Sequence, residues 1–451
     1  MNTLVCGMPG SGKSTLLVTM ALAVMRAIKA RRKIKLLVTD EHGTFAREVG
    51  KWAVRLGLEN RTAYDELACL DRGIGYRMRT ENCDALRRKR EREAFIEFVM
   101  FKRGFAGSHD HPFFREGLRI GWNLVTERKV QLPLGDMRWV LRPGRRRDNA
   151  IMACTNPTTW REAGSLSAMS RGEQDKVIRP ALRALDDLFD GVVFSSRCDG
   201  TYEFGDITIV EGSPLVSPEE LRVTIGMIVM QAIERGMVDD CEWFIICDEA
   251  ISLGTPWMAR RLEEIRKFGV NVTLAVQSPE WPEDVRRRIA QACGEQWYGL
   301  TSDYEVALWQ ARNLLASADP SRVEKLSRLQ QFHNGHEKEK VGGREVLVSQ
   351  YEERMVEFDR HVSLREQIDE LQWRMMGLDV GQFFHRKNGV RFVQVRETPA
   401  YPMYAREGEK RLARAIARMK RRDYYVDIQG EDVPVHEGTL QKVARWKTAD
   451  R

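Results

Sequence analysis

The feature that most constrains the fold is a glycine-rich segment near the amino terminus, Gly7–Ser14. It fits the pattern GxxxxGK(S/T) at every defined position, and it follows a short apolar run, Thr3–Cys6, that predicts a strand. The apolar stretch after it, through about Ile28, predicts a long helix. Glycines allow such a loop to wrap closely around a phosphate, so that N–H groups and the positive end of the next helix point at it. The segment therefore predicts a phosphate-binding loop within an α/β fold.

The residue types in this loop predict individual roles. The Lys13 ammonium is expected to reach the β- and γ-phosphates, and the Ser14 hydroxyl is expected to ligate Mg²⁺. The alternative is a chance glycine-rich turn, but the position between a predicted strand and a predicted helix is the one that phosphate binding requires. ATP with Mg²⁺ is therefore the expected ligand. The predicted nucleotide-binding residues are Gly7, Pro9, Gly10, Ser11, Gly12, Lys13, Ser14 and Thr15.

A second segment predicts the catalytic acids. Trp243–Cys247 is an apolar run typical of a buried strand, and Asp248 and Glu249 follow it directly. Ligands bind at the carboxyl ends of the strands in open α/β sheets, which is where these two acids would lie. Asp248 is expected to hold magnesium through water, and Glu249 to orient or deprotonate the attacking water. The alternative is a helix cap after a core strand, which is common for one acid and less common for two.

The next predicted strand adds two further candidates. Val272–Val276 ends at Gln277, whose amide could sense the γ-phosphate or position the water. Just upstream, Arg266 could reach an active site across a subunit interface, where a cation offsets charge on the transferring phosphoryl group. Arg260 and Arg261 compete for this role. The alternatives are ordinary loop chemistry for the amide and a favourable interaction with the helix macrodipole for the arginine.

The order of elements predicts four regions. A strand, the loop, a helix and a second strand, Ile34–Thr39, open a parallel sheet; the alternation then fades and resumes later. Ser217 begins a capping box that predicts a helix ending near Gly236. The predicted regions are residues 1–59 for the first part of a P-loop core, 60–190 for a mostly helical insertion, 191–317 for the second part of the core, and 318–451 for a C-terminal α+β extension.

The C-terminal extension carries few legible signals. Gln382–Phe384 and Val390–Val395, joined by the turn Lys387–Gly389, predict a β-hairpin. Glu407–Arg422 has apolar residues on one side and many basic residues on the others, which predicts a basic tail helix.

Composition argues against several classes of protein. The eight cysteines are scattered and form no CxxC pair, which argues against a zinc ribbon and a disulfide framework. No stretch of the sequence is long and apolar enough to cross a bilayer, because the best candidate, Thr15–Ile28, is too short and continues the phosphate loop. No signal peptide precedes the first predicted strand, so we expect a cytoplasmic protein. The net charge of +7 is compatible with a polyanionic partner without requiring one.

Taken in order, these segments resemble the FtsK/HerA superfamily of ring-shaped translocases, which includes DNA pumps, conjugation coupling and secretion ATPases, and genome-packaging ATPases. The resemblance implies a RecA-like core, ATP and Mg²⁺ as ligands, a homo-oligomer that is expected to be a hexamer, and a DNA cargo held through phosphate contacts. It covers roughly residues 1–60 and 190–315 and leaves the insertion without a match. The segments that carry it are Gly7–Ser14, the strand ending at Asp40, the helix Pro218–Arg235, the strand before Asp248, and Arg266–Asn271 leading into Gln277-Ser278-Pro279.

Several basic runs could contact nucleic-acid phosphates, namely Arg87–Arg92, Arg142–Arg147 and Arg286–Arg288. For a single run the simpler interpretation is a solvated helix face. Arg145–Arg147 is the best exception, since a basic Pro-Gly loop could line a pore. The segment His109–His111 offers two histidines and one acid without a further ligand nearby, so no metal is assigned there.

Three functions remain open at this point. The leading hypothesis is an ATP-driven ring motor that moves DNA, of the packaging, conjugation-like or mobile-element type. A second keeps the ATPase and replaces the cargo with an exported protein. A third is a nucleotide-dependent scaffold or switch that hydrolyses slowly while recruiting partners. DNA-stimulated ATP turnover separates the first hypothesis from the other two.

Overall fold

The structure is a computed structural model of the chain. It describes residues 1–30, 32–67, 72–74, 85–102, 112–129, 132, 134–189, 204–213, 216–315, 323–341, 344–387, 394–397 and 425–427. The predicted tail helix, Glu407–Arg422, and the segment His109–His111 lie outside the described residues.

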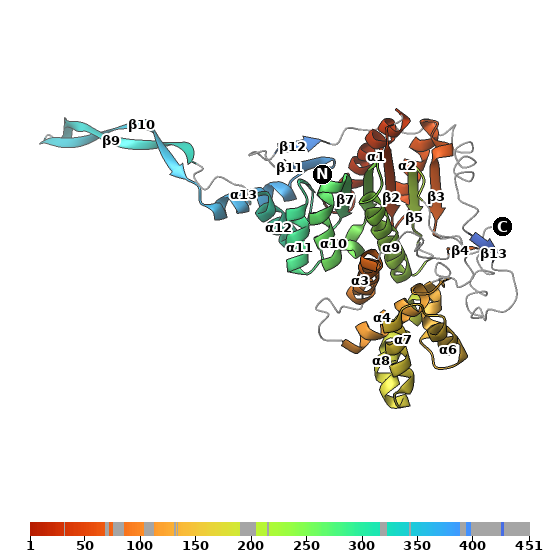
Figure 1. Cartoon of the computed structure of the whole chain (residues 1–451). Coiled ribbons are helices and arrows are strands. Elements are labelled where there is room, and N and C mark those ends of the chain that lie inside the picture. The colour runs from red at the N-terminus through yellow and green to blue at the C-terminus, as the bar shows by residue number, and fades with distance from the viewer. Residues whose placement is uncertain are drawn as a thin grey trace, which may run out of the picture.

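The centre of the molecule is a nine-stranded sheet with the strand order β12-β11-β8-β1-β7-β6-β2-β5-β3 (Figure 1). All pairs from β8 to β3 are parallel, whereas β11 and β12 are antiparallel to their neighbours. The mainly parallel sheet confirms the predicted α/β fold. The strands of this sheet are β1 (Thr3–Cys6), β2 (Ile34–Asp40), β3 (Thr62–Glu66), β5 (Ile207–Glu211), β6 (Glu242–Asp248), β7 (Val270–Val276), β8 (Glu295–Gly299), β11 (Gln382–Lys387) and β12 (Gln394–Glu397).

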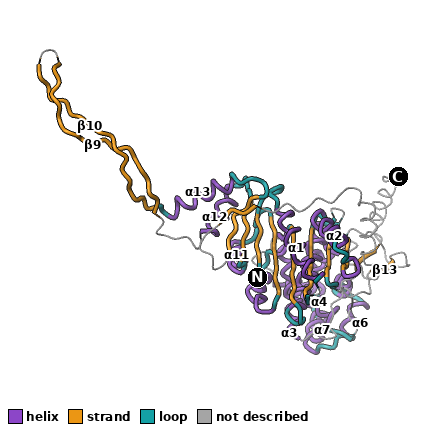
Figure 2. Tube along the Cα trace, turned by 90° about the horizontal axis from the view of Figure 1, so that it is seen from above, coloured by secondary structure: helices purple, strands orange, loops and turns teal. Residues whose placement is uncertain are grey.

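Helices cover both faces of the sheet, which explains why its central strands are almost continuously apolar (Figure 2). One buried cluster joins the first two helices to β1, β2 and β5, and a second, larger cluster lies on the other face. The first face carries α1 (Lys13–Lys29) and α2 (Thr44–Arg55). The second carries α9 (Pro218–Gly236), α10 (Pro256–Glu264), α11 (Glu283–Ala292) and α12 (Tyr304–Leu315).

Between β3 and β5 the described chain is mostly helical, as the sequence predicts. Figure 1 shows these helices below the carboxyl edge of the sheet. They are α3 (Ala85–Lys102), α4 (Pro112–Thr126), α5 (Met137–Val140), α6 (Arg145–Met152), α7 (Pro157–Ala168) and α8 (Arg171–Phe189). A short antiparallel pair, β4 (Arg72–Ile74) and β13 (Tyr425–Asp427), also lies outside the main sheet.

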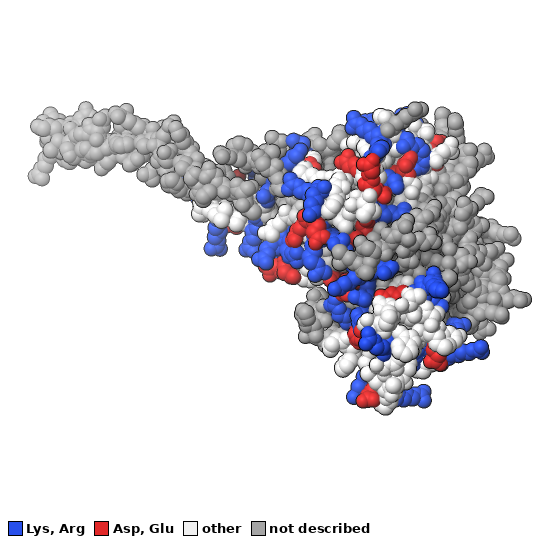
Figure 3. Space-filling view, viewed as in Figure 1, with Lys and Arg blue, Asp and Glu red and all other residues white. Residues whose placement is uncertain are grey.

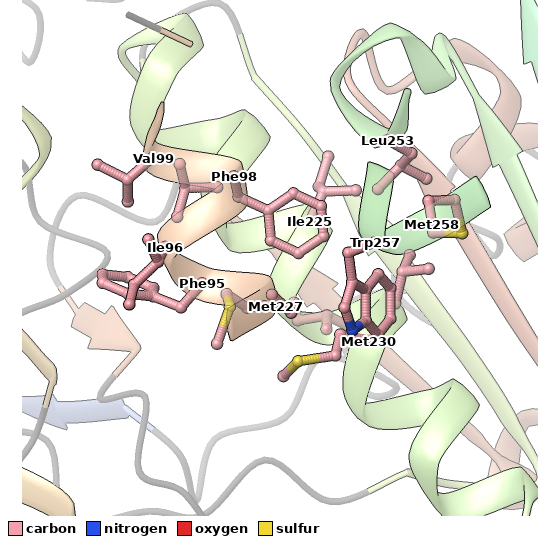
Figure 4. Close-up of a cluster of buried hydrophobic side chains, with 14 of the residues drawn as sticks. Phe95, Ile96, Phe98, Val99, Ile225, Met227, Met230, Leu253, Trp257 and Met258 are labelled. Carbon is pink, nitrogen blue, oxygen red and sulfur yellow. The ribbon is translucent and has the colours of Figure 1, made fainter. Parts of the chain in front are cut away.

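Helix α3 packs the insertion against the core (Figure 4). The Phe98 ring meets the Trp257 ring of α10 edge-on, with the ring centroids 5.9 Å apart. Gly226 of α9 makes room for this contact, because a Cβ atom there would lie 3.2 Å from the Phe98 ring. The insertion is therefore joined to α9 and α10 by a tightly packed apolar contact.

The C-terminal part adds two antiparallel pairs and one helix, α13 (Leu364–Met376). β9 (Val323–Val341) and β10 (Arg344–His361) form a long hairpin that projects from the body of the molecule (Figures 1 and 2). The predicted pairing of β11 with β12 is confirmed, although β11 continues through Lys387, where the sequence predicted a turn. β11 also pairs with β8, so this hairpin extends the core sheet. Among the described helices, none has the length and apolarity needed to cross a membrane.

Candidate active site

The phosphate loop lies between β1 and α1, as predicted. Gly10 and Gly12 have φ angles of 79° and 95°, a left-handed conformation that favours glycine. The Gly7 N–H donates to the Val276 carbonyl at 3.2 Å, and the Met8 N–H donates to the Leu300 carbonyl at 2.8 Å. These bonds fix the loop to the ends of β7 and β8. The loop therefore lies at the carboxyl edge of the parallel strands, where ligands bind in this class of fold.

Lys13 is buried and folded back over the loop. Its Nζ atom donates to the carbonyl oxygens of Gly7 at 2.6 Å and Met8 at 3.1 Å. Burial lowers the pKa of Lys13, while the carboxylates of Glu249 and Asp248 oppose that shift. Among the described residues, the ammonium thus donates only to neutral carbonyls and faces two acids, an arrangement in which a phosphate would be a stronger partner.

Asp248 meets the loop through Ser14. The Ser14 hydroxyl donates to Asp248 Oδ2 at 3.3 Å, so two predicted magnesium ligands from distant parts of the chain lie side by side. Asp248 is 7% exposed, and burial raises its pKa to about 7, with the charges of Asp40 and Glu249 adding to the effect. Asp40 is its direct register partner on β2.

This donor set fits a magnesium ion better than a metal held by protein alone. In the described part of the chain, no group of three or more His, Cys, Asp or Glu side chains could hold a metal. Mg²⁺ usually takes one or two protein oxygens and completes its shell with water and substrate phosphates. The hydroxyl of Ser14 and the carboxylate of Asp248 match that pattern, and a divalent cation would relieve the repulsion around Asp248.

Glu249 has an unusual backbone conformation. Its φ and ψ angles are 52° and 47°, and it is the one non-glycine residue with positive φ among the described residues. It follows β6 directly and begins the turn η4 (Ala250–Leu253). Such a conformation is uncommon outside glycine and is concentrated at functional sites. The strain supports the predicted catalytic role of Glu249 over the alternative of a simple helix cap.

Gln277 holds the Glu249 side chain. Gln277 Nε2 donates to Glu249 Oε1 at 2.5 Å from the end of the neighbouring strand β7. The structure thus brings together the strand-end residues that the sequence singled out separately. Lys13, Ser14, Asp248, Glu249 and Gln277 converge at one place on the carboxyl edge of the sheet.

Arg266 lies away from this place. It is exposed in the turn η5 (Ile265–Phe268), just before β7 begins, and so at the amino edge of the sheet. The pKa of the Met1 amino group is lowered mainly by burial and further by the charge of Arg266, which places Arg266 near the start of the chain. Arg266 is therefore on the edge opposite its own phosphate loop.

The two competing arginines are engaged within the subunit. Arg260 Nη2 donates to Glu97 Oε1 of α3 at 2.7 Å. Arg261 is buried and pairs with Glu234 at 2.8 Å. Both arginines hold α10 against neighbouring helices, which favours Arg266 as the candidate for a role across an interface.

Sequence reasoning gave no role to two acids at the end of β2. Asp40 Oδ2 accepts the backbone N–H groups of Phe45 at 2.7 Å and Ala46 at 3.1 Å in the first turn of α2, and Oδ1 accepts that of His42 just before the helix. Glu41 is buried, which raises its pKa, and accepts from Arg222 Nε at 3.4 Å and from Ser252 Oγ at 3.3 Å. A cavity of about 230 Å³ lies beside this contact; its lining residues are Phe98, Glu219, Arg222, Val223, Ile251, Ser252 and Glu280.

The basic run Arg142–Arg147 differs from its prediction as a loop. Arg145 begins α6, and Arg147 is buried, where its guanidinium donates to Gln174 Oε1 at 3.1 Å. Arg142 is exposed and pairs with Asp186 at 2.9 Å. The loop prediction is wrong because Gly144 ends the irregular segment and the three arginines that follow form the first turn of a helix.

Solved structures with a similar fold include coupling proteins of bacterial conjugation. The chain matches the bacterial conjugative coupling protein TrwBdeltaN70 in an unbound form, with a TM-score of 0.56 and 13% identity over 90% of this chain and 86% of that one. It matches the plasmid coupling protein TrwB in complex with a non-hydrolysable ATP analogue with a TM-score of 0.56 and 16% identity, at the same coverages. A complex of TrwB with ADP and Mg²⁺ gives a TM-score of 0.53 and 14% identity, covering 90% and 87%.

These matches establish the class of fold. No protein-family model and no curated protein sequence matches the chain. At such low identity the structural likeness shows the fold, which is the RecA-like P-loop core predicted from the motifs. The fold that the resemblance implied is therefore confirmed.

Proposed function

We propose that this chain is an ATPase that binds ATP with Mg²⁺ at Gly7–Ser14 and hydrolyses it with Glu249. The observation that carries this proposal is the convergence of five polar side chains on the carboxyl edge of the sheet. Three of them come from the ends of two neighbouring strands, β6 and β7, and each of the five has the chemistry that phosphoryl transfer requires. The similar TrwB structures that contain ADP with Mg²⁺ or an ATP analogue support the choice of ligand.

The residues divide the reaction between them. Lys13 leaves its carbonyl partners to contact the β- and γ-phosphates, while Ser14 and Asp248 hold the magnesium ion. When bound, Mg²⁺ neutralises charge on the phosphate oxygens. Glu249, oriented by Gln277, accepts a proton from water as the water oxygen bonds to the γ-phosphorus and the bond to ADP breaks. The products are ADP and phosphate.

We also propose that the chain acts as a ring, with Arg266 of one subunit facing the nucleotide of the next. Its position on the amino edge excludes a role at its own loop, and its surroundings leave it exposed. A closed ring built from head-to-tail contacts would bring opposite edges of neighbouring subunits together. A hexamer is the expected form.

DNA is the cargo that we favour, in a conjugation-like or packaging role. The structures with a similar fold are coupling proteins of conjugation, and this role is known for those proteins, not for this chain. On this chain, Figure 3 shows basic side chains interspersed with acidic ones on the visible face, with further basic side chains over the helical insertion. Such a surface would hold DNA by scattered phosphate contacts rather than through one broad basic patch. Protein export and a slow nucleotide-dependent scaffold are the alternatives.

Measurement of ATP turnover by the purified chain tests the proposal. We expect Mg²⁺-dependent hydrolysis that Lys13→Ala abolishes, because the cation for the β- and γ-phosphates is lost, and that duplex DNA stimulates. Arg266→Ala should bind ATP normally and hydrolyse it poorly, and mixing it with the Glu249→Gln protein should restore some turnover. Absence of turnover by the parent under any condition contradicts the ATPase. Turnover that no DNA stimulates contradicts the cargo alone.

A further inference from the structure

A turn of the C-terminal part lies directly against the phosphate loop. The Gly381 N–H donates to the Ser11 carbonyl at 3.0 Å, and a Cβ atom at Gly12 would lie 3.0 Å from the Gly381 Cα atom. Gly381 belongs to the turn Asp379–Gln382, which follows α13 and ends at the first residue of β11. The φ angle of Gly381 is 89°. The close approach of two glycines leaves no space for a side chain between this turn and the loop.

The position of this turn relative to the catalytic residues is defined by the sheet. β7 and β6, which supply Gln277 and Glu249, lie on one side of β1; β8 and then β11 lie on the other. Because β11 is antiparallel to β8, it begins at the same edge where the parallel strands end. A nucleotide whose γ-phosphate faces Glu249 must direct its remaining part away from β6. The turn Asp379–Gln382 is on that side of the loop.

A second segment on this side presents an aromatic ring. Tyr304 lies three residues before Ala307 on the core-facing stripe of α12, where Ala307, Ala311 and Leu314 are buried, yet Tyr304 is 54% exposed. Gln310 contacts the end of β1 through the Cys6 sulfur at 3.2 Å. Tyr304 is six residues earlier, so a helical rise places it about 9 Å further along the axis, beyond the edge of the sheet. The loop before it is fixed to the phosphate loop by the bond from Met8 to Leu300.

An exposed apolar side chain completes the arrangement. Val380, in the turn against Gly12, is 71% exposed. Aromatic rings and small apolar side chains are the groups that cover the flat faces of nucleic-acid bases in binding sites. Both Tyr304 and Val380 extend from segments that are hydrogen-bonded to the phosphate loop, on the flank away from the catalytic acids.

We infer that Tyr304 and Val380 form the nucleoside-binding surface of this site, against which the base of the bound nucleoside triphosphate packs. The inference rests on the proposed nucleotide binding and adds the residues that hold the part of the ligand beyond its phosphates. It also gives the C-terminal extension a role, since the turn Asp379–Gln382 couples β11 to ligand binding.

Binding of two ligands tests this inference. ATP carries a base and tripolyphosphate does not, while both fill the phosphate loop in the presence of Mg²⁺. The test protein is the double variant Tyr304→Ala/Val380→Ser, and its conservative control is Tyr304→Phe/Val380→Ile. A second control, Trp160→Ala/Met152→Ser, removes exposed apolar groups from the helical insertion, because Trp160 is 53% and Met152 72% exposed. Affinities come from competition with a fluorescent ATP analogue.

We expect the double variant to bind ATP about tenfold more weakly or worse, since loss of one stacked aromatic commonly has this effect. Its affinity for tripolyphosphate should stay within about twofold of the parent, and both controls should bind both ligands as the parent does. Unchanged ATP affinity would overturn the inference while leaving the ATPase proposal intact. Equal losses for both ligands would also overturn it, because the two residues would then act through the loop. A parent that binds neither ligand would contradict the proposed function itself.

Discussion

Buried carboxylates occur both at the carboxyl edge of the sheet, called here the catalytic edge because the candidate active site lies there, and at the junction between α3 and α10. The groups around the carboxylates differ between the two places. Glu97 of α3 has a side chain that is 13% exposed, and it accepts from the Trp257 N–H at 2.5 Å and from Arg260 at 2.7 Å. Asp248 is 7% exposed and has the hydroxyl of Ser14 and an adjacent N–H as donors, with Asp40 and Glu249 as acidic neighbours. Burial raises the pKa of both carboxyls.

The difference separates a structural carboxylate from one arranged for a ligand. Glu97 caps the start of α10 and is neutralised by a guanidinium, so its interactions are complete within the subunit. Asp248 lies near the carboxylates of Asp40 and Glu249, whose effect on its pKa exceeds that of the nearby Lys13 ammonium. This grouping costs stability unless a further cation binds. Burial alone therefore does not identify a functional acid; the charges and donors around it do. The predictions below test this comparison, beginning with the largest expected effect.

Glu249→Gln should lower ATP turnover by about 10²–10⁴-fold, since the group that accepts the proton from water is lost. ATP binding should stay near the parental affinity, because Lys13, Ser14 and Asp248 are unchanged. Single-turnover hydrolysis and nucleotide binding by the same preparation would measure both quantities. Glu97→Gln is the matched control, because it neutralises a buried glutamate that lies outside the catalytic edge. Turnover by the Glu249→Gln protein at the parental rate would exclude Glu249 as the base.

Glu97→Ala should lower the free energy of unfolding by about 1–3 kcal/mol, because the N–H of Trp257 and the Arg260 guanidinium both lose their acceptor. Chemical denaturation monitored by tryptophan fluorescence would measure it. Glu116→Ala is the control, since Glu116 forms a half-buried pair with Arg119, which keeps Glu162 as a second carboxylate partner. If Glu97→Ala leaves stability unchanged but reduces turnover as strongly as Glu249→Gln, the assignment of Glu97 as structural is wrong.

In the absence of ligand, Asp248→Asn should raise the free energy of unfolding, whereas Glu97→Ala lowers it. Removing the charge relieves repulsion from Asp40 and Glu249, and the expected gain is about 1 kcal/mol in the free energy of unfolding. The same variant should lose the stabilisation that Mg²⁺ with ATP gives to the parent, because the metal ligand is gone. Thermal melts with and without Mg²⁺ and ATP would report both effects. A loss of stability in the ligand-free variant would contradict the idea that Asp248 is arranged for a cation.

The catalytic edge was largely predictable, because its signals are local in the sequence. The phosphate loop, the acids after Trp243–Cys247 and the amide after Val272–Val276 each follow a recognisable strand, and parallel strands end at one edge. The contact of Gly381 with the loop was not predictable, because it depends on an antiparallel strand pairing with β8 from far along the chain. The same holds for Phe98 and Glu97, whose helix is rich in charge and carries no sign of the surface against which it packs.

The mispredicted basic loop shows how burial changes the meaning of a charge run. Arg145, Arg146 and Arg147 are identical in type, yet only the first two are exposed. Arg146 lies over the Trp139 ring, 5.2 Å from its centroid, whereas Arg147 is buried against Gln174. Any contact with a polyanion therefore falls to Arg145 and Arg146, and replacing Arg147 would test folding instead of binding.

The smallest expected effect concerns this surface. The double variant Arg145→Ala/Arg146→Ala should bind duplex DNA more weakly than the parent, with a salt dependence shallower by about two released counterions at most. Affinity should vary little with base composition, because contacts to phosphates carry no sequence information. ATP affinity should not change, since the phosphate loop is untouched. The control is Arg26→Ala/Arg55→Ala, which removes two exposed arginines from α1 and α2, outside the helical insertion. Equal salt slopes for both double variants and the parent would remove α6 from the DNA-binding surface, and a parent that binds no DNA at low salt would count against a DNA cargo altogether.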